Sequence, residues 1–170
     1  DMALRHDSVA IVYGQKDDNE IINMMSKIWL PNDENFMDYQ EIEAFIISLM
    51  KDYKVKEVAY DPAFFERSAQ VLLDRGVPMV NFPQTHSRMI PACGNAYDLI
   101  ANTKVRHNGD PTFTDQVMSA AQRTTDMGWR LSKGRSKRKI DGAIAMVLML
   151  DRITAPEPLD DEPEVAIINL

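Results

Sequence analysis

Two aspartates stand where a carboxylate could either bind a cation or begin a helix. Asp61 follows the β-rich run Val55 to Tyr60 and precedes Pro62, which prevents the strand from continuing. Ligands of α/β sheets gather at the carboxyl ends of strands, so a functional carboxylate is expected at this position. An aspartate before a proline also suits the capping turn of a following helix, and the residue types alone favour neither role.

Asp141 opens the strongly apolar stretch Ile140 to Ile153, directly after the basic run 137–139. An acid at a helix start complements the helix dipole. A carboxylate at the end of a buried helix, beside clustered cations, also suits a metal ion that meets a phosphate group. The residues at 142, 143 and 145 are small, so we expect another backbone to approach closely here.

The sequence begins at Asp1 without an initiator methionine, so we interpret the chain as a fragment or a processed piece. Asp7 follows six residues later, just before the first β-rich run. Asp1, Asp61 and Asp141 are spaced by 60 and 80 residues. The first would precede or belong to a hairpin strand, the second follows a central strand, and the third starts a late helix. Carboxylate oxygens favour hard cations such as Mg²⁺ or Mn²⁺ over zinc.

Positive charge is concentrated in one segment of an acidic chain. The formal net charge is -7, and residues 151–170 hold six acidic side chains and one basic one. Residues 104–139 hold nine basic and three acidic side chains. A cationic strip can hold phosphates whatever the net charge, although charge alone favours a solvated loop. The candidates for contact with a phosphate backbone are Lys133, Arg135, Lys137, Arg138 and Lys139.

Several other classes of protein are excluded by composition. The single cysteine excludes a disulfide framework and a cysteine-only zinc cluster. The three histidines are scattered and lack metal-ligand spacing. No apolar run approaches the ~18–20 residues of a membrane span, and no signal peptide opens the sequence, so no membrane partner is expected.

The elements that must position these residues alternate along the chain. Apolar runs at 8–14 and 21–30 around a polar turn predict a β-hairpin. Helices are expected at 39–49, 64–73, 87–101, 113–122 and 140–153, and strands at 55–60, 77–80, around 105 and at 129–131. The third helix requires Pro91 in its first turn. A hairpin followed by alternating helices and strands predicts an α/β fold with a mixed β-sheet flanked by helices. We assign residues 1–153 to one domain and 154–170 to an acidic, proline-containing tail.

Local sequence around these residues resembles the nuclease domain of the large terminase subunit of tailed phages, which has a ribonuclease H-like fold of the resolvase-integrase type. The resemblance covers nearly the whole chain up to about Ile153, and it depends on the order and spacing of its segments. Five segments carry it: Asp1 to Ala10, Tyr60 to Pro62, the stretch from Phe82 to Pro111, Gly128 to Lys133, and Lys139 to Ala145.

This resemblance implies metal-dependent cleavage of concatemeric double-stranded phage DNA, coupled to packaging into a capsid. It implies that Asp1, Asp61 and Asp141 are catalytic and bind Mg²⁺ or Mn²⁺, with Asp7 as an auxiliary ligand. Two ions ~3.5–4 Å apart would activate a water and stabilise the leaving oxygen. No Gly-x-x-x-x-Gly-Lys-Ser/Thr loop occurs, so no ATP site is expected in this chain.

The resemblance also implies partners and a location. The partners are double-stranded DNA, a terminase ATPase domain, the small terminase subunit and the portal or procapsid, and the location is the cytoplasm of an infected bacterium. Two alternatives stay open. A Holliday-junction resolvase-like nuclease on the same fold would prefer branched over linear DNA. A non-catalytic DNA-docking module of a packaging motor would show no metal-dependent nicking.

Overall fold

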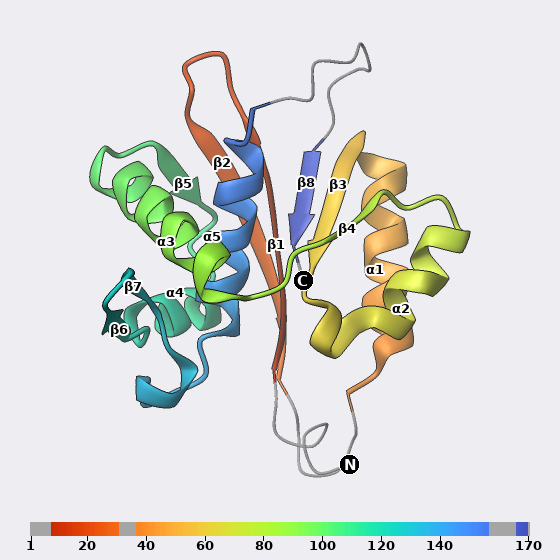
Figure 1. The fold of residues 1–170 in the computed structure, drawn as a ribbon. Coiled ribbons are helices and arrows are strands. Elements are labelled where there is room, and N and C mark those ends of the chain that lie inside the picture. Colours follow the sequence, from red (N-terminus) through yellow and green to blue (C-terminus); the bar gives the residue numbers. More distant parts are fainter. Residues whose placement is uncertain (1–7, 31–36, 157–165, 170) are drawn as a thin grey trace.

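The computed structural model describes residues 8–30, 37–156 and 166–169, which form a central sheet with helices on both faces (Figure 1). In chain order the elements are β1 (Val9–Lys16), β2 (Ile22–Trp29), α1 (Tyr39–Asp52), β3 (Val55–Tyr60), α2 (Pro62–Asp74), β4 (Met79–Asn81), α3 (His86–Ala101), β5 (Val105–His107), α4 (Pro111–Met118), β6 (Gln122–Thr125), β7 (Gly128–Leu131), the 3-10 helix η2 (Lys133–Arg135), α5 (Asp141–Ile153) and β8 (Ala166–Asn169).

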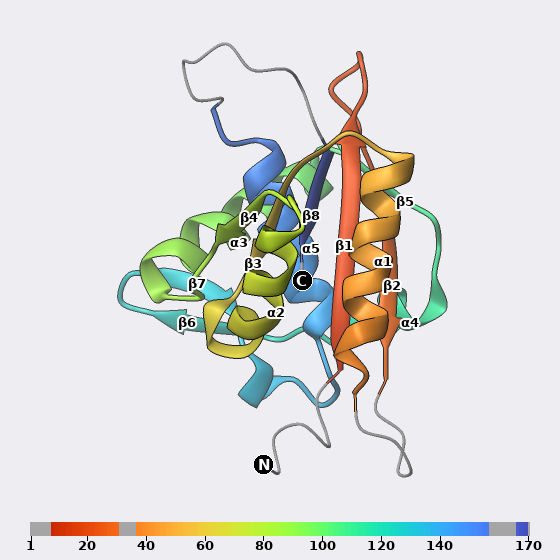
Figure 2. The ribbon, with the colours of Figure 1, turned by 90° about the vertical axis from the view of Figure 1, so that its right-hand side faces the viewer.

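The sheet has mixed strand directions, as the sequence predicts. Its strand order is β4-β3-β8-β1-β2-β5, and β6 pairs with β7 in a separate hairpin. β1 runs antiparallel to both β2 and β8, whereas β3 is parallel to β4 and β8. Helices α1 and α2 cover one face of the sheet, and α3, α4 and α5 cover the other (Figures 1 and 2).

Alternation along β1 divides its side chains between two cores. Ala10 and Val12 pack in the cluster with α3, α4 and α5, while Ile11 packs against α1 and α2. This alternation is the period-2 pattern of a strand that is buried on both faces. The predicted hairpin of β1 and β2 is confirmed, with Val9 opposite Trp29 and Lys16 opposite Ile22.

Helix α5 lies against the centre of the sheet and is the most buried helix of the described residues. Residues 142–150 are all buried, as the continuous apolar sequence predicts. At Gly142 the nearest neighbours are side chains from α4 and β2. A Cβ placed on Gly142 would lie 3.1 Å from Gln116 Oε1 and 3.2 Å from Ile28 Cδ1.

Two local predictions differ from the structure. Helix α3 begins at His86, which places Pro91 in its second turn instead of the first, on an exposed side of the helix. Helix α4 ends at Met118, and residues 122–125, predicted as helix up to Gln122, pair with β7. Gly128, with φ of 130°, closes this hairpin in a conformation that residues with a Cβ rarely adopt.

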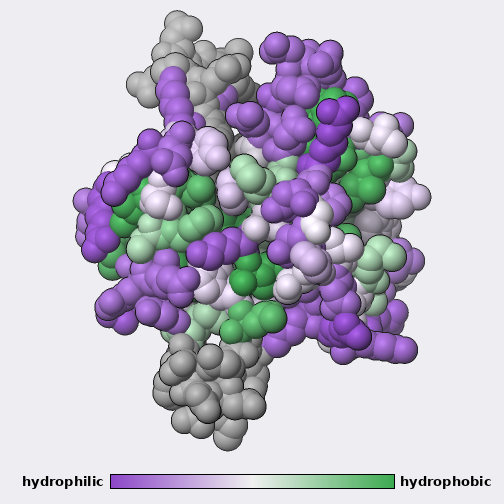
Figure 3. Space-filling model, turned by 180° about the vertical axis from the view of Figure 1, so that it is seen from behind, coloured by the Kyte–Doolittle hydropathy of each residue, from purple (hydrophilic) through white to green (hydrophobic). Residues whose placement is uncertain are grey.

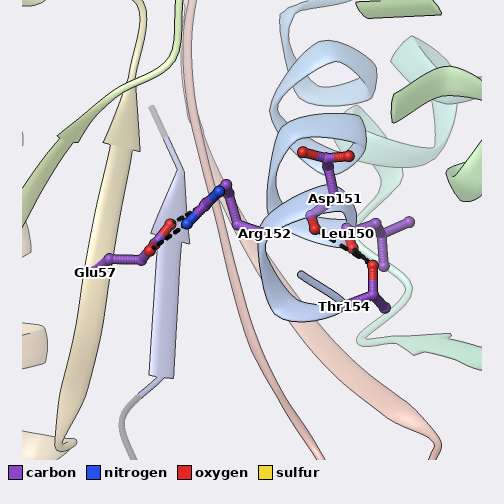
Figure 4. Close-up of polar contacts among 5 residues, drawn as sticks. All are labelled: Glu57, Leu150, Asp151, Arg152 and Thr154. Atoms are coloured by element: carbon purple, nitrogen blue, oxygen red, sulfur yellow. Dashed lines mark hydrogen bonds and ion pairs between the residues drawn. The ribbon is translucent and has the colours of Figure 1, made fainter. Parts of the chain in front are cut away.

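Strand β8 brings residues from the predicted tail between β1 and β3 (Figure 1). The run of two isoleucines in β8 has the β-branched composition of a central strand. Arg152 at the end of α5 reaches across β8 to Glu57 on β3, with N–O distances of 2.6 and 2.9 Å (Figure 4). The division into a domain at 1–153 and a tail at 154–170 stays a prediction.

Hydrophilic residues cover most of the face shown in Figure 3, and hydrophobic groups form several separate patches among them. None of the helices within the described residues combines the length and the apolar character that crossing a lipid bilayer requires.

Candidate active site

Asp141 is the first residue of α5, and both oxygens of its carboxylate have partners. Ser8 Oγ, immediately before β1, donates a hydrogen bond to Asp141 Oδ2. Lys133 Nζ, from η2, forms an ion pair with Asp141 Oδ1. The Asp141 side chain is only 11% exposed, so most of its water has been replaced by these two groups. The site therefore already holds a positive charge against this carboxylate.

The start of α5 is fixed by a buried side chain from α4. Gln116 is 3% exposed, and its Oε1 accepts a hydrogen bond of 2.6 Å from the backbone N–H of Gly142. The first N–H groups of a helix have no partner within the helix, so Gln116 satisfies one of them. The helix dipole at this end favours a negative charge, which also suits Asp141.

Asp61 begins α2 directly after β3. Its Oδ1 accepts a hydrogen bond of 3.1 Å from the backbone N–H of Ala63, so the capping role open from sequence is confirmed. Capping does not exclude cation binding, because a carboxylate has two oxygens with about four lone-pair sites. Asp61 is only partly buried.

Strand register brings Asp61 and Asp141 to one end of the sheet. Asn169 of β8 lies opposite Val12 of β1 on one side and Ala59 of β3 on the other. Since β1 and β3 run in opposite directions on either side of β8, the start of β1 and the end of β3 point the same way. The two strands are two strand spacings apart, or roughly 10 Å.

Ser8 precedes β1 at that end and contacts Asp141, and Asp61 follows β3 there. Figure 1 shows the lower ends of β1, β3 and α5 directed to this same side of the molecule. Asp1 and Asp7 lie outside the described residues. Within the described ranges, no group of three or more His, Cys, Asp or Glu residues could hold a metal ion.

The donor set at this end nevertheless suits a hard cation. It consists of carboxylate oxygens and a serine hydroxyl, which are ligands that Mg²⁺ and Mn²⁺ prefer. The ammonium group of Lys133, which pairs with Asp141, is a cation already bound at this point. The described residues therefore supply oxygen donors of the kind that a divalent metal takes, but not a complete set of three acidic ligands.

The basic segment, residues 133–139, is anchored to the rest of the fold at two points. Ser136 Oγ donates to the carbonyl of Ser132 at 2.8 Å and accepts from the Ala121 N–H at 3.0 Å. Arg138 forms a 2.6 Å ion pair with Asp115 of α4, and this hydrogen bond raises the pKa of Arg138.

The five predicted phosphate-binding residues consequently differ in their surroundings. Lys133 forms an ion pair with Asp141, and Arg138 forms one with Asp115. Arg135 and Lys137 are exposed on the same loop, and Lys139 is partly buried beside the start of α5. Contact of these residues with phosphate stays a prediction.

Sequence reasoning missed two residues of the site. Ser8 directly follows Asp7 and precedes an apolar strand, and a polar residue at that point is the available signal. Gln116 lies three residues after the buried Phe113 on one face of α4, so a glutamine on an apolar helix face is its signal. Neither signal specifies Asp141 or Gly142 as the partner.

Comparison with known proteins identifies the family and the fold of this chain. Residues 4–157 match the model of the protein family described as terminase large subunit, endonuclease domain. The large terminase subunit of Enterobacteria phage HK97 is 28% identical over 116 residues, covering 66% of this chain and 23% of that protein. This chain thus spans about a quarter of that relative.

Solved structures show the same fold. The crystal structure of the HK97 bacteriophage large terminase has a TM-score of 0.79 at 22% identity, covering 89% of this chain and 38% of that chain. The large terminase nuclease of thermophilic phage G20c with bound magnesium has a TM-score of 0.61 at 16% identity, covering 86% of this chain and 82% of that chain. Its cobalt-bound structure gives the same TM-score at 17% identity and the same coverage.

These likenesses confirm the predicted ribonuclease H-like α/β fold, and the family match covers most of the sequence. The chain therefore belongs to the family of terminase large subunit endonuclease domains.

Proposed function

We propose that this chain cleaves concatemeric double-stranded phage DNA by two-metal phosphodiester hydrolysis. The observation that carries the proposal is that Asp141 and Asp61 lie at the same end of the sheet. The Asp141 carboxylate is nearly buried and forms an ion pair with a cation. The magnesium and cobalt bound by the G20c nuclease support a divalent metal here.

The proposed ligands are Asp61 and Asp141, joined by Asp1 and the auxiliary Asp7 from the segment outside the described residues. When bound, a pair of Mg²⁺ or Mn²⁺ ions supplies an activated water and stabilises the leaving 3′ oxygen. The chain's own contribution is to hold its carboxylates in place. Ser8 and Gln116 do this by fixing the Asp141 side chain and the start of α5.

The basic segment would hold the DNA backbone. Arg135 and Lys137 are exposed beside the start of α5, and Lys139 precedes it by two residues. Contacts to phosphate position a duplex without reading its sequence. We therefore propose that this segment gives affinity for DNA but no preference for a particular sequence.

The wider setting is proposed from the family. A terminase ATPase domain would drive translocation, and the small terminase subunit and the portal or procapsid would bring the nuclease to its DNA. The infected bacterial cytoplasm is the corresponding location. This sequence has no phosphate-binding loop of its own, so ATP-dependent movement would belong to the ATPase domain.

Plasmid cleavage tests the proposed activity. Purified native protein should nick or linearise plasmid with Mn²⁺ or Mg²⁺ and should lose this activity in chelator. Asp141→Asn and Asp61→Asn should each reduce cleavage to the level of the chelated control, since each removes one anionic ligand. Asp98→Asn, at an exposed position of α3, controls for the loss of one charge. Native-level cleavage by a folded Asp141→Asn protein would remove the assignment.

A further inference from the structure

A hollow opens on the α1 face of the sheet, at the end away from Asp61 and Asp141. Its volume is about 380 Å³, at the lower end of the ~300–1,000 Å³ of small-ligand pockets. Its walls come from β1, β2, β5, the end of α1 and the start of β3. Ser8 contacts Asp141, whereas Gln15 of the hollow lies seven residues further along the chain, or roughly 23 Å in an extended strand. The hollow is therefore separate from the candidate active site.

Strand register arranges the floor of the hollow in two rows across the sheet. In the first row Tyr13 of β1, which packs with the core on the α1 side, lies opposite Met25 of β2. In the second row Gln15 lies opposite Asn23, and Asn23 lies beside Arg106 of β5. Residues directly opposite each other share a face of the sheet. The hollow consequently has an apolar half under the end of α1 and a polar half toward the outer strand.

The apolar half is aromatic and partly open to solvent. The rings of Tyr13 and Tyr53 are 6.3 Å apart, and Met25 and Tyr53 are 38% and 42% exposed. The hydroxyl of Tyr13 donates to the Met25 sulfur at 3.8 Å, which is a weak acceptor. Burial and the neighbouring Tyr53 raise the pKa of Tyr13, so this hydroxyl keeps its proton at neutral pH. This half suits a planar apolar group, whose burial would remove the exposed side chains from water.

The polar half offers a positive charge to a ligand. Arg106 is exposed, and its guanidinium has no ion-pair or hydrogen-bond partner within the described residues. Asp17 lies nearby, but its carboxylate already accepts hydrogen bonds from the backbone of Ile21 and Asn19 and from the side chain of Asn23. These bonds, that from Ile21 most, lower the pKa of Asp17, and Arg106 contributes least. A carboxylate suits Arg106 better than a doubly charged phosphate, which the Asp17 charge would repel more strongly.

The hollow reaches a free edge of the sheet. β5 is the outermost strand and pairs with β2 alone within the described residues, while α1 lies over β1 and β2 (Figure 2). The outer backbone groups of such a strand can pair with an added strand, which is a common way of binding extended peptides. Side chains two residues apart in that peptide point to the same face. One of them can therefore enter the hollow while the other meets Arg106.

We propose that the hollow binds an extended peptide of a partner protein, with an aromatic side chain against Tyr53 and Met25 and a carboxylate two residues away on Arg106. The charge of Arg106, the exposed aromatic wall and the free edge of β5 each supply one part of this recognition. The inference does not depend on the proposed nuclease function, because the surface lies at the opposite end of β1 from Asp141.

Peptide titration, followed by amide NMR of the isotope-labelled protein, tests the proposal. The probe is a blocked Asp-Thr-Trp-Thr-Asp pentapeptide, which places a carboxylate two residues from the ring in either strand direction. It should shift the amide signals of Met25, Tyr53 and Arg106 with a dissociation constant of about 1 mM or below. Matched peptides with Asn in place of Asp, or Ser in place of Trp, should bind about fivefold more weakly, since each lacks one of the two contacts.

Three variants assign the contacts. Arg106→Gln should weaken binding of the acidic probe about fivefold and leave binding of the Asn peptide unchanged, because only a carboxylate gains from the guanidinium. Tyr53→Ser removes the exposed aromatic wall and should weaken both peptides about threefold. Arg75→Gln removes an exposed arginine at the end of α2 and should bind the probe as the native protein does. The amide spectrum of each variant also shows whether it is folded.

Several outcomes would overturn the proposal. One is the absence of any saturable shift of these amides at ~5 mM probe, and another is equal affinity for the acidic and Asn peptides. Unchanged binding by Arg106→Gln, or an equal loss in Arg75→Gln, would show that Arg106 does not recognise the carboxylate. Thymidine monophosphate, which combines a planar ring with a phosphate, is the remaining ligand to test. If it shifts the same amides at lower concentration than the probe does, the hollow is a nucleotide site and the peptide assignment is wrong.

Discussion

At the scale of single residues, the Asp141 carboxylate is held by two side chains that the fold brings to it. Ser8 is 133 residues away in sequence and contacts one of its oxygens. Lys133 is close in sequence but reaches it only because η2 and the following turn fold back on the start of α5. A carboxylate so enclosed can be offered to a metal in a fixed orientation, which is the usual contribution of a protein to such a site.

Asp151, near the other end of α5, gives a pH-dependent prediction. Burial is the main cause that raises the pKa of Asp151, and it outweighs attraction from Arg152 and Arg88. Protonated Asp151 therefore contributes stability below the ordinary aspartate range, and this contribution is lost as pH rises through the raised pKa. Asp151→Asn should be more stable than native protein at pH ~7, and the difference should shrink toward pH ~4.

Urea unfolding across that pH range measures the effect. Asp18→Asn, at an exposed turn, controls for the loss of one charge. A difference between Asp151→Asn and native protein that grows toward acid pH would contradict the expected sign.

At the scale of elements, the sequence predicts most helices and strands because their burial is periodic. β3 occupies the predicted residues 55–60, and α5 begins one residue after its predicted start. Nine consecutive residues of α5 are buried, as expected for a helix that is apolar on nearly every side. The short hairpin of β6 and β7 is missed on one side, because residues 122–125 are polar and mostly exposed and carry no apolar period.

Contacts between elements are much less predictable than the elements themselves. Sequence places Asp61 after a strand and Asp141 at a helix start, and the structure confirms both positions. The partners Ser8 and Gln116 depend on which strand lies beside which helix, and local pattern contains no such information. The central place of β8 is likewise set by pairing across more than 100 residues from β3 and β1.

The ion pair between Arg152 and Glu57 ties α5 to β3 across β8 (Figure 4). Their side chains are 24% and 16% exposed, so each is poorly solvated without the other. Breaking a buried pair costs ~3–5 kcal/mol, and partial exposure reduces the expected loss for Arg152→Met to about 1–3 kcal/mol. The same hydrogen bond raises the pKa of Arg152, so its guanidinium stays charged.

Chemical denaturation of Arg152→Met at neutral pH measures this loss. Arg138→Met is the matched control, because its pair with Asp115 is exposed at 67% and 49% and should contribute little. The double variant Arg152→Met/Glu57→Gln should lose less stability than the two single changes together. Equal stability of Arg152→Met and native protein would show that the pair does not hold α5 to β3.

At the scale of the whole molecule, charge is separated along the chain. The net charge of -7 would oppose approach to DNA if it were spread evenly, but residues 104–139 are positive overall. That segment ends beside Asp141, so the positive region adjoins the candidate metal site. An acidic body with one positive surface restricts where a polyanion can bind.

Salt dependence of DNA binding tests this arrangement. The logarithm of the affinity for duplex DNA falls linearly with the logarithm of salt concentration, with a slope of about -0.9 for each phosphate contacted. Arg135→Ala/Lys137→Ala should therefore reduce the magnitude of the slope by about 1.8 if both side chains contact phosphate. The affinities would be measured in chelator by fluorescence anisotropy, so that no cleavage occurs.

Lys51→Ala/Lys54→Ala makes the same charge change near the start of β3, at the end of the sheet away from Asp61, and should leave the slope unchanged. Equal slopes for the native protein and Arg135→Ala/Lys137→Ala would place the DNA on another surface. A reduced slope in this variant alone would locate the phosphate backbone beside Asp141, which is where a nuclease needs it.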